Sequence, residues 1–188
     1  MCNHRSGPRP AAARRRGLAS VMALCLVASV NVASVHMASA HAAEPSATFA
    51  LRQLVPEIAL KAARAALEQC RSMGAQVTVV VADRSGAAQV LLRDRFAGQH
   101  TLEAARQKAW TAASFRLSTA ALAAETEPGR PMAGLRSMPQ VLAVAGGLLI
   151  EADGSVLGAI GVSGAPGGDA DDRCASAGLR AIAEDIAF

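Results

Sequence analysis

Aromatic side chains are scarce in this chain. Its 188 residues include no tyrosine, one tryptophan and four phenylalanines, although 52% of the residues are hydrophobic. Alanine makes up much of that fraction, so helices can pack at short range, but each residue buries little apolar area. The composition therefore argues against a core built on large aromatic rings. It favours association with further copies of the chain as an additional source of buried area.

Histidine and cysteine are equally scarce once the first 42 residues are set aside, because only His100, Cys70 and Cys174 remain. A single imidazole, with no acid placed to orient it, argues against a Ser-His-Asp hydrolase. One histidine and two distant cysteines are a poor set of zinc ligands. Two cysteines are also too few for a disulfide framework. They either form a disulfide outside the cytoplasm, within or between subunits, or remain as buried thiols.

The common nucleotide and hydrolase motifs are missing as well. Gly158, Gly161 and Gly164 recur at intervals of three residues, which differs from the Gly-x-Gly-x-x-Gly pattern of dinucleotide-binding folds. The segment lacks the Gly-Lys-Ser/Thr of a phosphate-binding loop, and Ala165 stands where a nucleophile elbow has its second glycine. We interpret this segment as a buried strand edge followed by a turn. A helix then starts near Asp169, where a carboxylate metal site remains a minor alternative.

The N-terminal segment has the pattern of an export signal. Five arginines precede an apolar run from about residue 18 to residue 35, and Ala40-His41-Ala42 follows as a small-x-small cleavage site. We expect residues 1–42 to be a signal peptide and residues 43–188 to form a single domain in the periplasm or outside the cell. The pair Arg14-Arg15 leaves both general and twin-arginine export open.

The charge of the remaining chain excludes a basic nucleic-acid footprint. Residues 1–42 hold five of the 19 Lys and Arg residues and none of the 15 Asp and Glu residues, which leaves 14 basic and 15 acidic groups. The positive charge of the whole sequence therefore belongs to the predicted signal. We expect no nucleic-acid partner.

The periodicity of the remaining sequence predicts an α/β domain of the α+β type, with an antiparallel sheet built from two hairpins and helices packed on its faces. Helical spacing begins near Leu54, and the first strand is mostly β-branched, as in a strand buried on both faces. The expected helices are residues 54–73, 101–115, 118–125 and 169–186, the expected strands 77–82, 88–93, 148–151 and 156–162, and the expected loop 127–139.

One face of the helix 101–115 carries the candidate ligand-binding groups. Helical geometry places five residues on this face: His100, Ala104, Gln107, Lys108 and Thr111. An imidazole or a hydroxyl there can reach a metal, the small Ala104 leaves room for a flat ligand, and Lys108 can meet a carboxylate. The alternative is an ordinary half-exposed helix face, with Thr101 as its N-cap and a solvated lysine.

Several blocks along the chain, taken in order, resemble one family. They are Val80 to Gly86, Ala97-Gly98 with Thr101, Lys108-Ala109-Trp110-Thr111-Ala112, Ser118-Thr119, Ala145-Gly146-Gly147, and Gly158 to Ala165 with Asp169 and Asp172. Together they look like the GlcG/HbpS-type haem-binding domain, nearest to its secreted branch. The chain departs from the family pattern after its second predicted strand, where Arg95 takes the place of a usual acidic residue.

The resemblance implies a domain that self-assembles, often into octamers, and binds haem. Because the chain has no Cys-x-x-Cys-His motif, the haem would be held non-covalently. The family associates the iron with a threonine that corresponds to Thr111, and His100 is a second candidate iron ligand. Lys108 and Arg116 are candidates to neutralise the propionates, and so, less favoured, is Arg106.

Two other functions remain open at this point. One is a small-molecule oxidoreductase or a flavin- or corrinoid-linked accessory enzyme, although no nucleophile, base or cofactor motif supports it. The other is a signalling protein that docks on a membrane sensor or transporter. The preferred hypothesis is an exported haem-binding protein, more a binding protein than an enzyme, that captures, stores or senses haem.

Overall fold

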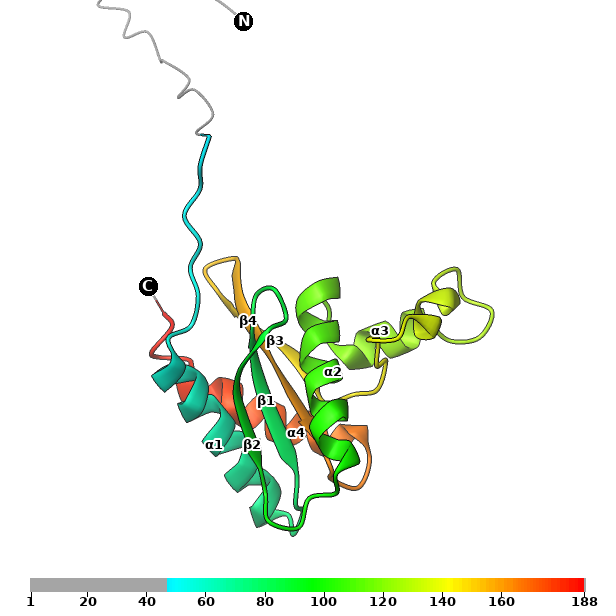
Figure 1. Ribbon diagram of the computed structural model, residues 1–188, viewed down its shortest axis with the longest axis horizontal. Coiled ribbons are helices and arrows are strands. Elements are labelled where there is room, and N and C mark those ends of the chain that lie inside the picture. The colour runs from blue at the N-terminus through cyan, green and yellow to red at the C-terminus, as the bar shows by residue number, and fades with distance from the viewer. Residues whose placement is uncertain (1–46, 188) are drawn as a thin grey trace, which may run out of the picture. The chain divides into compact units, whose positions relative to one another are not determined.

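The computed structural model describes residues 47–187, so the predicted signal peptide lies outside the described residues. Four strands form one antiparallel sheet in the order β2-β1-β4-β3, which confirms the predicted α+β class (Figure 1). The elements follow in the order α1 (Pro56–Ser72), β1 (Thr78–Asp83), β2 (Ala88–Arg93), α2 (His100–Phe115), α3 (Thr119–Glu125), η1 (Ala133–Ser137, a 3-10 helix), β3 (Gly147–Ala152), β4 (Ser155–Ser163) and α4 (Gly168–Ile182).

Helices cover both faces of the sheet. α1 and α4 pack against each other and against one face, whereas α2 packs on the other face over β1, β4 and β3 (Figure 1). None of the helices within residues 47–187 has the length and apolar character needed to cross a membrane.

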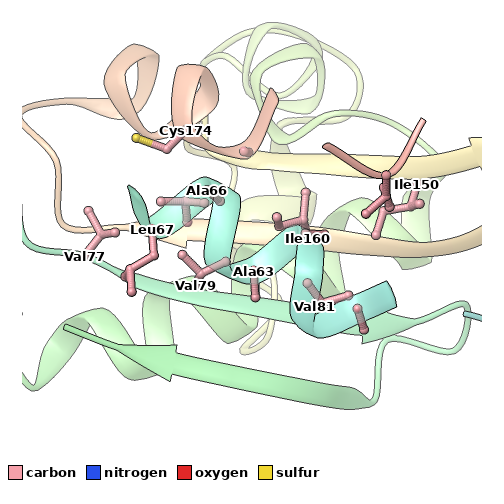
Figure 2. Packing of buried hydrophobic residues seen from close by; sticks show 14 of the residues in the cluster. Ala63, Ala66, Leu67, Val77, Val79, Val81, Ile150, Ile160 and Cys174 are labelled. Atoms are coloured by element: carbon pink, nitrogen blue, oxygen red, sulfur yellow. The ribbon is translucent and has the colours of Figure 1, made fainter. Parts of the chain in front are cut away.

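β1 is an inner strand of the sheet and is buried on both faces, as its mostly β-branched sequence predicts. Val79 and Val81 point into the main core beneath α1, where Figure 2 shows them beside Ala63 and Ile160. Val80 points to the opposite face and packs against alanines of α2. Alternation of side chains along a strand explains this division, and a strand buried on both faces has no polar side to present.

Small residues bring α2 close to the sheet. A Cβ atom at Gly161 of β4 would lie 2.6 Å from the backbone nitrogen of Ala109 on α2. The helix backbone therefore rests almost directly on the strand backbone. Gly158 and Gly164, the other two glycines of this spacing, approach the backbone of Ala82 and Gln76 instead, so each of the three glycines allows a close backbone contact.

A disulfide joins the two helices on the other face. Cys70 near the end of α1 bonds to Cys174 of α4, with their Cα atoms 5.5 Å apart and a sequence separation of 104. Of the alternatives that the sequence left open, the structure shows the pairing within one chain.

Most predicted boundaries are confirmed to within two residues, but one cap is wrong. The chain enters α2 at His100, and Thr101 lies inside the first turn, where it does not act as the N-cap. Its hydroxyl donates to the Gly98 carbonyl at 2.6 Å and shares a buried hydrogen bond of 2.8 Å with the hydroxyl of Thr78. Thr101 thus ties the helix to β1. Two other differences are the 3-10 helix inside the predicted loop and the end of α4 at Ile182, four residues early.

Candidate functional site

Lys108 lies in the interior between α2, β4 and α4. Lys108 is only 3% exposed. Its Nζ atom donates to Asp171 Oδ2 at 2.7 Å and to the Val162 carbonyl at 2.9 Å. The other oxygen of Asp171 accepts from the Ala165 backbone nitrogen at 3.0 Å. The ammonium that the sequence assigned to a propionate therefore already has an internal carboxylate partner.

Two glycines make room for this lysine. A Cβ atom at Gly146 would lie 2.8 Å from Lys108 Nζ, and one at Gly147 would lie 2.6 Å from the Lys108 carbonyl oxygen. The Gly146 nitrogen donates to Asp172 Oδ1 at 2.6 Å. We call Lys108, Asp171, Asp172, Gly146 and Gly147 the Lys108 clamp. It joins α2, the turn before β3 and the start of α4.

The electrostatics of the Lys108 clamp reflect its burial. Loss of water raises the pKa of the Asp171 carboxyl above its usual value, and the neighbouring Lys108 opposes that effect only in part. Burial also raises the pKa of Asp172, with the Gly146 N–H acting in the opposite direction. The carboxylates of Asp171 and Asp172 thus accept hydrogen bonds from donors inside the domain. Between residues 47 and 187 no cluster of three or more His, Cys, Asp or Glu side chains is arranged to hold a metal ion.

Thr111 is fully buried, at 0% exposure. Its hydroxyl oxygen accepts a hydrogen bond of 3.0 Å from the Leu142 backbone nitrogen, and it lies 3.4 Å from the Gln140 carbonyl that it faces as donor. Gln107, one turn earlier, donates to the Pro139 carbonyl at 3.2 Å. The segment 139–142 therefore covers the part of the predicted ligand face that contains Thr111.

His100 lies at the opposite end of α2 and is exposed. Eleven residues separate it from Thr111, which at the rise of an α-helix is about 16 Å along the axis. The two candidate iron ligands therefore share a face of the helix but do not meet at one point. Arg116 is exposed just beyond the other end of the helix, where it adopts a left-handed conformation with φ 56°.

Arg106, the remaining candidate for a propionate, pairs with Glu103 one turn away, at 2.6 Å between Arg106 Nη2 and Glu103 Oε1. This bond lowers the pKa of Glu103. An exposed pair of this kind, spaced three residues apart, is a common feature of helix surfaces and contributes little to stability.

The chain also matches a known family. A family model described as "Haem degrading protein HbpS-like" matches residues 54–180, more than half of the sequence. The chain belongs to the HbpS-like family. This confirms the resemblance that the sequence blocks indicated.

Solved members of the HbpS-like family share the fold. The chain is 38% identical to a double mutant of HbpS from Streptomyces reticuli, with a TM-score of 0.67 over 74% of this chain and 93% of that one. A structure described as a PduOC:heme complex is 30% identical, with a TM-score of 0.66 over 69% of this chain and 95% of that one. Among curated proteins, the corrinoid adenosyltransferase PduO of Salmonella typhimurium is 34% identical over 103 residues. The match covers 54% of this chain but only 31% of that relative.

The HbpS-like sequence blocks meet in the Lys108 clamp. The lysine block, the Gly-Gly pair and the acidic start of α4 come together there, although up to 63 residues separate them. Sequence reasoning missed this convergence, and it also missed Phe96, which is 79% exposed in the turn before α2. The only available signal for Phe96 was the departure from the family pattern at Arg95-Phe96.

Proposed function

We propose that this chain is an exported, self-associating protein that binds haem non-covalently, for capture, storage or sensing. The observation that carries the proposal is its likeness to a protein solved as a haem complex, over 95% of that protein's length. The family description, which speaks of haem, supports the same class of ligand.

The described residues fit such a ligand at the chemical level. Haem iron takes axial ligands from His, Cys, Met or Tyr. The chain has no tyrosine, and both cysteines of the described part are used in the disulfide. One histidine and three exposed methionines remain in the described part: His100, Met73, Met132 and Met138. The imidazole of His100 is the first candidate because imidazole is the commonest metal ligand in proteins, whereas the Thr111 hydroxyl is covered by segment 139–142. Of the proposed propionate partners, Arg116 is exposed and Lys108 is engaged by Asp171.

The Cys70–Cys174 disulfide supports export. Disulfides persist in the periplasm and outside the cell and are rare in a reducing cytoplasm. Together with the signal-like residues 1–42, the disulfide supports a periplasmic or secreted location. N-terminal sequencing of the protein recovered after export would test this, since it should begin near residue 43.

Exposed apolar side chains support self-association. Four of them, around α3 and the loop that follows it, are 38–45% exposed: Leu117, Met132, Met138 and Val144. Burial of such side chains between copies would add the apolar area that an alanine-rich core lacks. Sedimentation equilibrium would give the number of copies, octamers included. A membrane sensor or transporter as a further partner stays a prediction from the sequence.

A corrinoid-linked accessory role is the second candidate, because the chain resembles a 31% portion of a corrinoid adenosyltransferase. The two proposals predict different ligands. Haemin titrated into the purified protein should give a Soret band shifted from that of free haemin, with saturation at a defined stoichiometry. Cobalamin and flavin should give no saturable change. Saturable binding of cobalamin or flavin, with no response to haemin, would reverse the proposal.

A further inference from the structure

We infer that the haem iron is bound by His100 and that the porphyrin lies against Phe96, at the start of α2, with Thr111 taking no part in coordination. The inference rests on the proposed haem-binding function and assigns its site. It follows from what each candidate side chain already does in the fold.

Thr111 and His100 cannot serve the same iron within one chain. Both axial ligands contact the metal directly, whereas these residues lie about 16 Å apart along a single helix. A choice between them is therefore required. Thr111 is 0% exposed and holds Leu142 N at 3.0 Å, so iron could reach its oxygen only after segment 139–142 had left. His100 is exposed and needs no such rearrangement.

Gly98 leaves space for the imidazole and orients it. A Cβ atom at Gly98 would lie 2.6 Å from His100 Cε1 and 2.8 Å from Nδ1, but 3.8 Å from Nε2. The ring therefore rests with its Nδ1 edge on the glycine, and Nε2 is the nitrogen farther from it. Imidazole is the commonest metal ligand in proteins, and it binds through one ring nitrogen while the other is held by its surroundings.

Phe96 supplies a flat apolar surface four residues before His100. Its side chain is 79% exposed, although burying a phenylalanine is favourable by about 1.5–3 kcal/mol. The turn that presents it is firmly anchored. Asp94, 2% exposed, pairs with Arg71 at 2.7 Å, and the Ala97 nitrogen donates to the Asp94 carbonyl at 3.1 Å. An exposed aromatic ring on an anchored turn, four residues before an exposed imidazole in the sequence, suits a planar apolar ligand that contains a metal.

Arg95 adds a charge that matches the ligand. It precedes Phe96 in the same turn and its residue is exposed. Its backbone N–H donates to Asp94 Oδ1 at 2.9 Å, which fixes the turn and leaves the guanidinium as the group that faces solvent. A haem propionate is a carboxylate, the group to which guanidinium binds with two parallel hydrogen bonds. The turn thus offers an axial ligand, an apolar face and a cation.

Haemin titration of single variants tests the inference. His100→Ala should lose the coordinated Soret spectrum and at least tenfold in affinity, equivalent to about 1.4 kcal/mol. Added imidazole should restore the coordinated spectrum. Thr111→Val should keep the spectrum of the unchanged protein. Gly98→Ala, which displaces the ring, should change the spectrum while leaving the far-ultraviolet circular dichroism unchanged.

Phe96 has a matched control in Phe49, which is 82% exposed in the segment before α1. Phe96→Ala should weaken haemin binding severalfold, whereas Phe49→Ala should not. A coordinated spectrum that survives in His100→Ala and is lost in Thr111→Val would overturn the inference. If the unchanged protein binds no haemin at all, the proposed function itself fails, so the two failures are distinguishable. Since His100 is exposed, His100→Ala should remain folded, and its unfolding midpoint checks this.

Discussion

Replacement of Lys108 by methionine separates a structural from a ligand-binding role for this residue. The change removes the ammonium but keeps most of the volume of the side chain. Asp171, whose side chain is 5% exposed, would then remain as a buried carboxylate without its cation at 2.7 Å. Breaking a buried ion pair in this way costs about 3–5 kcal/mol. For a domain of this size, each kcal/mol lowers the melting temperature by about 2–4 °C. We therefore expect a loss of roughly 6–20 °C.

Urea unfolding followed by circular dichroism measures the loss in free energy of unfolding, and a thermal melt measures the fall in melting temperature. Two further variants serve as controls. Lys61→Met breaks an exposed pair with Asp185 of the same 2.7 Å length, where Lys61 is 52% exposed, and should cost less than about 1 kcal/mol. Lys108→Met combined with Asp171→Asn removes both charges while the amide oxygen still accepts from Ala165. This double variant should regain a large part of the stability, since the isolated charge is gone.

One result would refute the reasoning. Lys108→Met could unfold at the same urea concentration as the wild-type protein and yet lose haemin affinity. In that case the ammonium binds the ligand, and the Lys108 clamp does not stabilise the packing of α4. That outcome would restore the role that the sequence pattern assigned to Lys108.

Three further predictions concern the fold. Replacing both Cys70 and Cys174 by serine should cost about 2–5 kcal/mol in urea unfolding, because the bond closes a loop with a sequence separation of 104, and reducing agent should then have no further effect. Gly161→Ala should destabilise the protein by about 1–3 kcal/mol by pushing α2 off the sheet, whereas Gly134→Ala, with no atom within 4 Å of the new Cβ, should be nearly neutral in thermal melts. The paired guanidinium holds the pKa of Asp94 at about 2 against its usual 3.8. Stability should therefore be lost as the pH falls from about 4 to about 2, and a pH series of melts should flatten in Asp94→Asn.

Local patterns explain why much of the fold could be predicted. The strand 88–93 was predicted with the bounds that the structure has, because a tight turn at residues 83–86 precedes it. Pro56 occupies the first turn of α1, within two residues of the predicted start near Leu54. Ser118 caps α3 by accepting from the Ala121 nitrogen at 3.1 Å. Each of these features depends on residues within about four positions of one another.

The features that sequence reasoning missed depend on distant segments. Whether Cys70 and Cys174 pair is decided by how α1 packs on α4, and the burial of Lys108 by Asp171, 63 residues away. The helical face was correctly spaced, but its exposure was not predictable, because segment 139–142 folds over Thr111 from beyond α3. A sequence gives the period of a helix, whereas the sheet and loops around the helix decide which part of that face meets water.

The residues that identify the family and the residues proposed to bind haem occupy different parts of the molecule. The lysine block, the glycine pair and the acidic start of α4, which resemble the family, form the Lys108 clamp in this chain, and the Lys108–Asp171 pair at its centre is buried. His100 and Phe96 lie in and before the first turn of α2, next to the point where the chain departs from the family pattern at Arg95. Membership of the family therefore predicts the fold more firmly than the ligand geometry. Transplanting residues 95–100 into an HbpS-like domain that lacks a histidine there should transfer an imidazole-ligated haem spectrum with no change in fold, and a failure to transfer it would locate coordination elsewhere.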